Sequence, residues 1–137
     1  MGHSQAPPAF HTQTEKPNSP PMPDSLTSLR HQLAAFAAER DWQQFHAPKN
    51  LACALNVEAG ELLEHFQWMT EAQSRALEPE QKQAVAAEIA DVLLYLVQLS
   101  DALGIDPVAA AQDKILVNAQ KYPVASARGN SRKHGAP

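Results

Sequence analysis

The placement of proline divides this chain into segments and limits what each segment can form. Six of the eleven prolines lie within residues 1–23, and four of the others stand at positions 48, 79, 107 and 123. Proline breaks the interior of a helix but suits its first turn. The stretches that these prolines delimit carry apolar residues at helical spacing. The sequence therefore predicts an all-α fold with four long helices.

Local end signals set the expected bounds of these helices. Asp24 or Ser25 and Asp106 are capping residues, and Gly104 suits a left-handed stop. The predicted helices run from Asp24 or Ser25 to about Asp41, from Pro48 to about Met69, from Pro79 to about Leu103, and from Pro107 to about Lys121. We predict a four-helix bundle domain over 24–123. A disordered, proline-rich leader over 1–23 precedes it, and a basic, flexible tail over 124–137 follows it.

The charge and the apolar runs exclude several classes of partner. The formal net charge is −4, whereas proteins that follow a nucleic acid polymer need a basic excess. The longest purely apolar run, Val92 to Val97, is far shorter than the ~20 residues of a membrane span. A single cysteine, Cys53, fits a reducing compartment. We expect a cytoplasmic protein that binds neither a nucleic acid polymer nor a membrane.

The third predicted helix is apolar on nearly all sides. One stripe of five apolar residues runs from Val85 to Leu99, and Leu93, Leu94 and Val97 cover much of the remaining surface. Such a helix needs apolar cover all round, which one small bundle cannot supply. We therefore expect a homo-oligomer.

Acidic residues stand inside two apolar stripes. Glu58 shares a helix face with Leu55 and Leu62, and Glu61 lies one helical turn further along and flanks the same face. In the next helix, Glu88 lies on the face of Val92, and Asp91 follows one turn later. Two helices thus each carry an acid-x-x-acid pair on or beside a face that should point inward.

Such carboxylates need a proton or a cation. Two carboxylates about 4 Å apart repel by about 4 kcal/mol at an effective dielectric constant of 20. Oxygen-only ligands on helices suit Mg²⁺, or Mn²⁺, better than zinc, and Mg²⁺ commonly completes its shell with phosphate oxygens. The alternative is that all four acids lie on solvated flanks. Glu64 continues the spacing as a further ligand or an exposed residue.

Other polar and aromatic side chains admit two interpretations. Lys114, Asn118 and Lys121 share a face of the fourth helix, where they can bind a triphosphate or lie in a solvated last turn that favours the helix dipole. Trp68 and Tyr95 can belong to the core or can stack on a base.

The acidic pairs and their surroundings resemble a known family. The run from Glu58 to Glu64 (EAGELLE), followed by Glu88 to Leu93 (EIADVL), is similar to the E-x-x-E and E-x-x-D signature of the all-α NTP pyrophosphatases, the MazG-like superfamily. Four further blocks resemble its dCTP pyrophosphatase branch: residues 36–46 (FAAERDWQQFH), 65–68 (HFQW), 91–96 (DVLLYL) and 114–123 (K-x-x-x-N-x-x-K-Y-P).

The resemblance implies a function and roles for named residues. It implies a homotetramer built from dimers, which hydrolyses a nucleoside triphosphate to the monophosphate and pyrophosphate, with dCTP or a modified dCTP preferred. It implies that Mg²⁺ is held by four acids, Glu58, Glu61, Glu88 and Asp91. We expect the catalytic base to be Glu58 or Glu61. The residues implied to contact the substrate are Trp42, Trp68, Tyr95, Lys114, Asn118, Lys121 and Tyr122. The pattern departs at Leu33, where that branch has a histidine, which leaves the base preference open.

Two other functions are alternatives for a helical chain with these acids. A di-iron bundle needs Glu-x-x-His pairs, and the acids three residues after Glu58 and Glu88 are Glu61 and Asp91 instead. A non-enzymatic helical oligomeric interaction module remains the alternative, and release of pyrophosphate from a nucleotide would separate the two.

Overall fold

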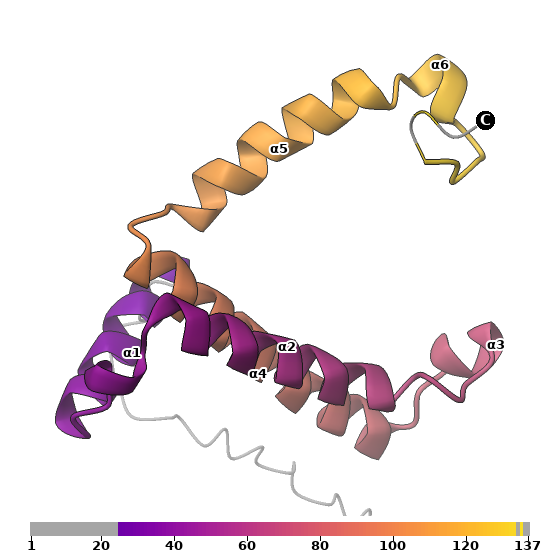
Figure 1. The fold of residues 1–137 in the computed structure, drawn as a ribbon. Helices are drawn as coiled ribbons and strands as arrows, with labels where there is room; N and C mark the ends of the chain where they lie inside the picture. The colour runs from indigo at the N-terminus through magenta and orange to yellow at the C-terminus, as the bar shows by residue number, and fades with distance from the viewer. Residues whose placement is uncertain (1–24, 134, 136–137) are drawn as a thin grey trace, which may run out of the picture.

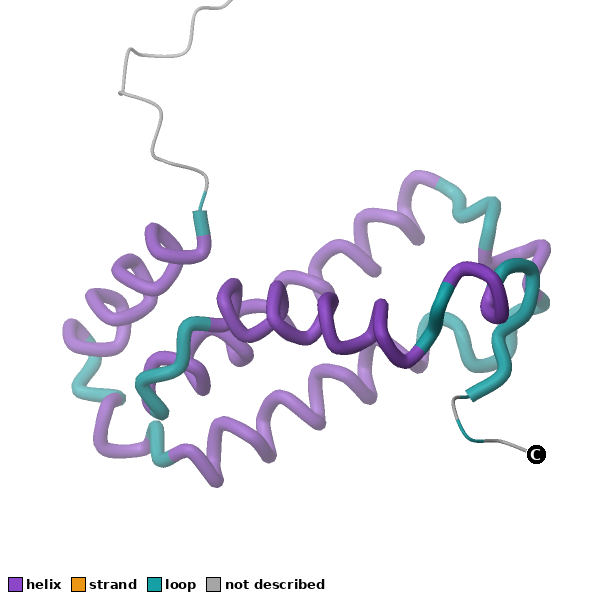
Figure 2. Tube along the Cα trace, turned by 90° about the horizontal axis from the view of Figure 1, so that it is seen from above, coloured by secondary structure: helices purple, strands orange, loops and turns teal. Residues whose placement is uncertain are grey.

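The described part of the chain is helical and contains no strand (Figure 2). The computed structural model describes residues 25–133 and 135. The elements are α1 (Leu26–Glu39), the short 3₁₀ helix η1 (Gln43–Phe45), α2 (Pro48–Glu64), α3 (Glu71–Ser74), α4 (Pro79–Ala102), α5 (Pro107–Lys121) and α6 (Val124–Ala127). The prediction of an all-α fold is confirmed. The predicted leader, residues 1–23, lies outside the described residues.

Local signals account for the ends of the long helices. Ser25 caps α1 by accepting a hydrogen bond from the backbone N–H of Ser28, and Asp106 caps α5 in the same way. Pro48 and Pro79 occupy the first turns of α2 and α4, where a missing N–H leaves no hydrogen bond unmade. Gly104 has φ +64° after the end of α4, which a glycine adopts without strain. These starts and this stop agree with the sequence prediction.

Two short helices and one helix end differ from the prediction. We predicted that the second helix would run to about Met69, but α2 ends at Glu64 and the chain turns instead. Thr70 then opens α3 with a capping box, in which its hydroxyl and the Gln73 side chain satisfy each other's backbone N–H groups. The Thr-x-x-Gln spacing is thus a local start signal for α3. Within the tail over 124–137, Val124–Ala127 forms the short helix α6.

The packed part of the molecule is built around α4 (Figure 1). Helix α2 lies along α4 in the most extensive helix pair, and α1 packs on the same helix less extensively. The buried apolar core consists of Ala37, Leu51, Val85 and Val97, drawn from all three helices. This core is small for a chain of 137 residues. Large apolar side chains, among them Ile89 at 52% and Leu96 at 43%, stay exposed on α4.

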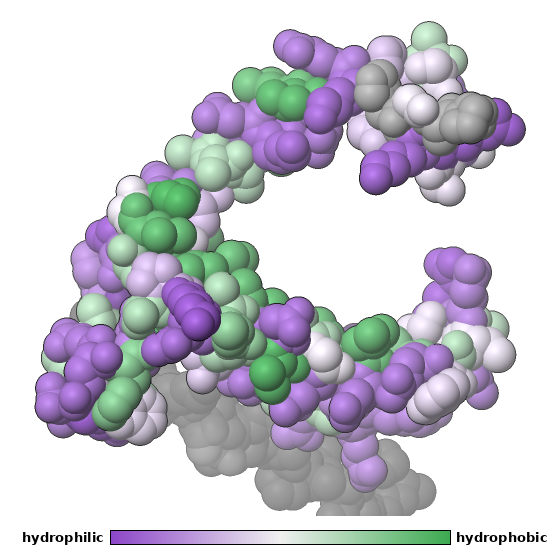
Figure 3. Space-filling model, in the orientation of Figure 1, coloured by the Kyte–Doolittle hydropathy of each residue, from purple (hydrophilic) through white to green (hydrophobic). Residues whose placement is uncertain are grey.

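Helix α5 leaves this packed part as a separate arm. In Figure 1 it extends from the end of α4 with an open space between it and the α2–α4 pair, and it has no buried residue. Its apolar side chains include Ile115 and Leu116, each 66% exposed. Figure 3 shows hydrophobic side chains at the surface both on α5 and along the α2–α4 pair.

One described helix, α4, is long and apolar enough to cross a membrane by length and composition alone, with a mean hydropathy of 1.3. The same helix carries Glu88 and Asp91 near its middle and packs on α2. The apolar surface of α4 therefore also fits a core helix that is only partly covered in a single chain.

Candidate functional site

Three carboxylates from two helices converge where α2 lies against α4. One oxygen each of Glu58, Glu88 and Asp91 lies within 4.8 Å of the other two. Glu58 comes from α2, and Glu88 and Asp91 stand one turn apart on α4. This close helix pair brings together two faces that the sequence identified separately. The cluster does not include Glu61, the fourth predicted ligand.

The electrostatics of Glu58 reflect this crowding. Partial desolvation, followed by the negative charges of Glu61, Asp91 and Glu88, raises the pKa of Glu58 above its usual value of 4.5. Both effects disfavour the ionised carboxylate. Glu61 thus acts on Glu58 through its charge although it lies outside the tight cluster. A divalent cation among these oxygens would remove the repulsion.

Glu88 has one oxygen without a hydrogen-bond partner. Its Oε2 atom is buried and unpartnered within the described part of the chain, while its Oε1 lies 3.9 Å from Nε2 of His65. A buried acceptor that stays unsatisfied is costly, and such atoms commonly meet an ion or an ordered water. The chemistry of the donor set, all carboxylate oxygen, fits a hard divalent ion.

Trp42 lies in an aromatic cluster beside the start of α2. Its ring meets Phe36 edge-on, with the ring centroids 5.7 Å apart, and the Arg40 guanidinium carbon lies 3.5 Å from the centre of the Phe36 ring. Asp41, immediately before Trp42, has φ +53°. Its backbone carbonyl and its carboxylate both accept hydrogen bonds from the Gln44 side chain. This turn holds Trp42 half exposed.

A shallow hollow connects Trp42 with the face of α4. Its lining includes Trp42, Phe45, His46 and Tyr95. Because Tyr95 is one turn beyond Asp91 on α4, this hollow adjoins the carboxylates. The structure thus brings two of the predicted base-contacting residues, Trp42 and Tyr95, together.

Trp68 lies at the opposite end of α2. It is 89% exposed and lines a separate open hollow with His65 and Gln73. Helix α2 separates it from Trp42, and a helix of 17 residues is about 25 Å long. One base therefore cannot contact Trp42 and Trp68 of the same chain.

The predicted phosphate-binding residues of α5 are not brought to the carboxylates. Lys114, Asn118 and Lys121 share a face of α5, as predicted from their spacing. In the single chain, however, this helix stands away from the α2–α4 pair (Figure 1). Tyr122 follows at the end of the same helix. Sequence spacing gave the shared face correctly but carried no information on where the whole helix would lie.

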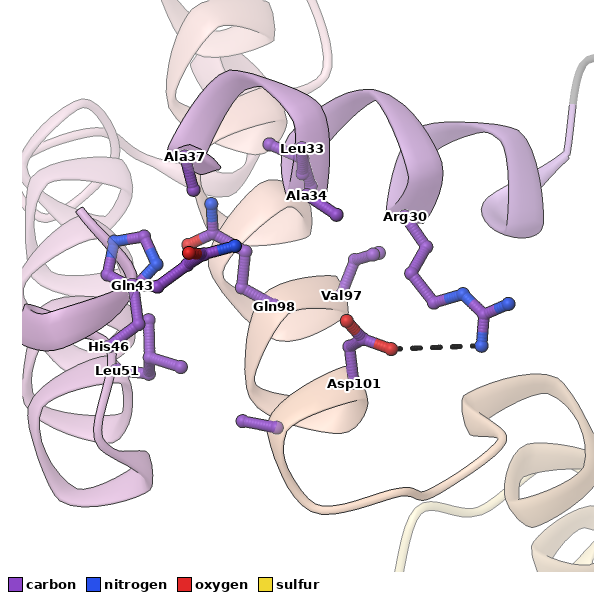
Figure 4. Close-up of a pocket in the computed structure, with 11 residues that line it drawn as sticks. Arg30, Leu33, Ala34, Ala37, Gln43, His46, Leu51, Val97, Gln98 and Asp101 are labelled. Atoms are coloured by element: carbon purple, nitrogen blue, oxygen red, sulfur yellow. Dashed lines mark ion pairs between the residues drawn. The ribbon is translucent and has the colours of Figure 1, made fainter. Parts of the chain in front are cut away.

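A second cavity, between α1 and α4, was not predicted. It measures about 220 Å³, and its lining includes Gln43, His46, Gln98 and the Arg30–Asp101 ion pair (Figure 4). A polar residue among apolar neighbours on α4 was the available signal, because Gln98 follows the run from Val92 to Val97. Leu33, the position of the departure from the family pattern, lines this cavity as well.

Comparison with known proteins identifies close relatives. The chain is 44% identical over 112 residues to dCTP pyrophosphatase 1 of Rattus norvegicus and 43% identical over 112 residues to that of Homo sapiens. Each alignment covers 80% of this chain and 66% of the relative, so the chain spans slightly less than two thirds of the proteins it matches.

A solved structure and a family description agree with these relatives. A pyrophosphatase from Archaeoglobus fulgidus superposes with a TM-score of 0.68 at 39% sequence identity, over 72% of this chain and 92% of that one. The model of the MazG-like family matches residues 53–136, which include most of α2, all four predicted metal ligands and α5. The chain therefore belongs to the MazG-like family, as its two acidic pairs indicated.

Proposed function

We propose that this protein is a divalent-metal-dependent nucleoside triphosphate pyrophosphohydrolase. It converts a (deoxy)nucleoside triphosphate and water to the monophosphate and pyrophosphate, with dCTP or a modified dCTP preferred. The observation that carries the proposal is the convergence of Glu58, Glu88 and Asp91 within 4.8 Å. The names of the rat and human relatives support the choice of substrate.

The carboxylate cluster would hold the metal, which we propose is Mg²⁺ or Mn²⁺. Glu58, Glu88 and Asp91 are the ligands nearest one another, and Glu61 is a fourth candidate one turn from Glu58. The buried, unpartnered oxygen of Glu88 fits this role. When bound, the ion supplies positive charge that offsets the triphosphate and makes its α-phosphorus more electrophilic.

Glu58 or Glu61 is our candidate for the general base, because a carboxylate beside the proposed metal site can accept a proton from water. In the proposed reaction, this glutamate takes a proton from the attacking water while the water oxygen bonds to the α-phosphorus. The bond from that phosphorus to the bridging oxygen breaks, and pyrophosphate leaves. Removing the proton from water makes it a stronger nucleophile.

We propose that the site is completed in a homo-oligomer, a tetramer assembled from dimers. A second copy would cover the exposed apolar residues of α4 and α5, such as Ile89 and Ile115. It would also bring a further Lys114 face and a further Trp68 within reach of the carboxylates and of Trp42. Burial of so much apolar surface is a strong drive to association. In this arrangement α4 is a core helix, and the protein is cytoplasmic and free of membrane.

Pyrophosphate release tests the proposal. The purified protein is incubated with Mg²⁺ and a panel of ribo- and deoxynucleoside triphosphates, and we expect release to be fastest with dCTP. Asp91→Asn and Glu61→Gln should each lower turnover more than tenfold, since each removes a charge from the metal site. Glu80→Gln, at the exposed start of α4, is the matched control. No release with any nucleotide would instead favour an interaction module.

A further inference from the structure

The cavity between α1 and α4 holds a polar atom that nothing in the described chain satisfies. Oε1 of Gln98 is buried and has no hydrogen-bond partner, and the Gln98 side chain points into the cavity in Figure 4. Leaving such an acceptor unpaired costs free energy, whereas a bound donor would recover it. The atom is therefore suited to accept a hydrogen bond from a ligand.

The position of Gln98 along α4 relates it to the carboxylate cluster. Asp91, Tyr95 and Gln98 follow one another at +4 and +3, so they lie along one side of the helix. The rise from Asp91 to Gln98 is about 10 Å, which is comparable to the span of a nucleotide from its α-phosphate to the far edge of its base. A substrate whose phosphates lie at Asp91 can thus pass Tyr95 and reach Gln98 with the far edge of its base.

The cavity itself fits a base rather than a whole nucleotide. Its volume of about 220 Å³ is below the roughly 300–1,000 Å³ of sites that enclose a complete drug-sized ligand. It shares His46 and Leu51 with the hollow beside Trp42 and Tyr95. The two hollows therefore border the same residues, and we expect a nucleotide that lies along α4 to extend from one toward the other.

The unpartnered acceptor of Gln98 favours a ligand that donates a hydrogen bond there. Asp101 also lines the cavity, but its carboxylate is paired with Arg30, 3.7 Å away, and lies apart from the Gln98 amide in Figure 4. An exocyclic amino group would satisfy Oε1 of Gln98, whereas a keto oxygen would leave it unpaired.

We propose that Gln98 determines base specificity: its Oε1 accepts a hydrogen bond from the exocyclic amino group of the substrate base, which selects cytosine over uracil or thymine. This inference rests on the proposed function for the placement of the phosphates. It concerns a residue outside the carboxylate and aromatic positions that carried the family resemblance. Loss of a donor–acceptor pair inside a site is a strong source of discrimination, because the unpaired group is left buried.

The test replaces Gln98 with methionine, which is similar in length but accepts no strong hydrogen bond. The ratio of kcat/KM for dCTP to that for dUTP is measured, because these substrates differ only at the base edge. We expect Gln98→Met to lower this ratio at least tenfold, mainly by raising KM for dCTP, while turnover of dUTP stays close to that of the unmodified protein. Retained dUTP turnover also shows that the variant folds. Gln83→Met, on the exposed face of α4, is the matched control.

Other outcomes contradict the proposal in distinguishable ways. If the unmodified protein hydrolyses dCTP but Gln98→Met keeps the ratio within twofold, or slows both substrates equally, Gln98 does not read the base. If no triphosphate is hydrolysed by the unmodified protein, the proposed function fails instead. Binding of dCMP and dUMP, measured by calorimetry without metal, then decides the role of Gln98. A preference for dCMP that disappears in Gln98→Met supports it, and equal binding of the two overturns it.

Discussion

The α2–α4 pair and the α5 arm contain similar side chains in very different surroundings. Leu51 on α2 is 2% exposed, whereas Ile115 on α5 is 66% exposed. The acids of α2 and α4 converge, whereas the lysines of α5 are exposed in the single chain. The first region organises its own core and its own charges. The second is complete as a helix but lacks the packing that gives an amphipathic helix most of its stability.

The largest expected difference between the two regions is in the free energy of unfolding that Leu51 and Ile115 each contribute. Leu51→Ala should destabilise the chain by about 2–5 kcal/mol, since it opens a cavity in the small core. Ile115→Ala should have little effect at low protein concentration and a larger one at high concentration, where a second copy covers it. Urea unfolding at two concentrations measures both. A concentration-independent loss for Ile115→Ala would mean that α5 is covered within its own chain.

A mixing experiment sharpens the comparison at the site. Asp91→Asn and Lys114→Ala should each reduce turnover about 100-fold, or about 2.7 kcal/mol of activation free energy. If α5 of one copy serves the carboxylates of another, subunit exchange between the two variants creates some sites with both residues intact. In a dimer about a quarter of the sites would recover. Pyrophosphate release after mixing checks this, and an unchanged rate would place both residues in one chain's site.

The junction of the two regions should show a smaller effect. Asp106 accepts hydrogen bonds from the backbone N–H groups of Val108 and Ala109, at 2.9 and 3.1 Å. Asp106→Ala removes this cap and should cost about 1 kcal/mol. The loss should appear as faster amide hydrogen exchange at the start of α5, while α2 is unaffected. Equal acceleration in both helices would show that α5 does not unfold independently.

The smallest expected effect is a pH dependence confined to the carboxylate region. Because the pKa of Glu58 is raised in the folded chain, the folded state binds more protons than the unfolded state between pH 4.5 and the raised value. Stability of the metal-free protein should therefore fall as the pH rises through this window. Thermal unfolding in a chelator measures the fall. Glu58→Gln should reduce it, and Mg²⁺ should restore stability above the window.

The helices and their caps were predictable because their causes are local. Pro48, Pro79 and Asp106 act within one turn of the chain, and Gly104 acts on its own backbone angle. The prediction that the second helix runs to about Met69 was wrong, although the capping box of Thr70 is a local signal for the separate helix α3. The faces of Glu58 and Glu88 were likewise predictable, because helical periodicity alone sets them.

Long-range placement was not available from the same signals. Periodicity put Trp42 and Trp68 among the base-contacting residues, but it could not show that the length of α2 keeps them apart. It put Lys114 and Asn118 on one face of α5 without showing where α5 lies. The cavity at Gln98 needs α1, η1, α2 and α4 together, and no single segment carries a sign of it.

The sequence by itself determined the helices, their ends, and two faces on which acids replace apolar residues, because each depends on neighbours within a few positions. Tertiary structure alone decided that three of those acids meet, that Trp42 joins Tyr95 but not Trp68, and that the Gln98 oxygen is buried without a partner. These depend on contacts between residues far apart in the chain, where the packing of whole helices, and not the local pattern, sets the distances.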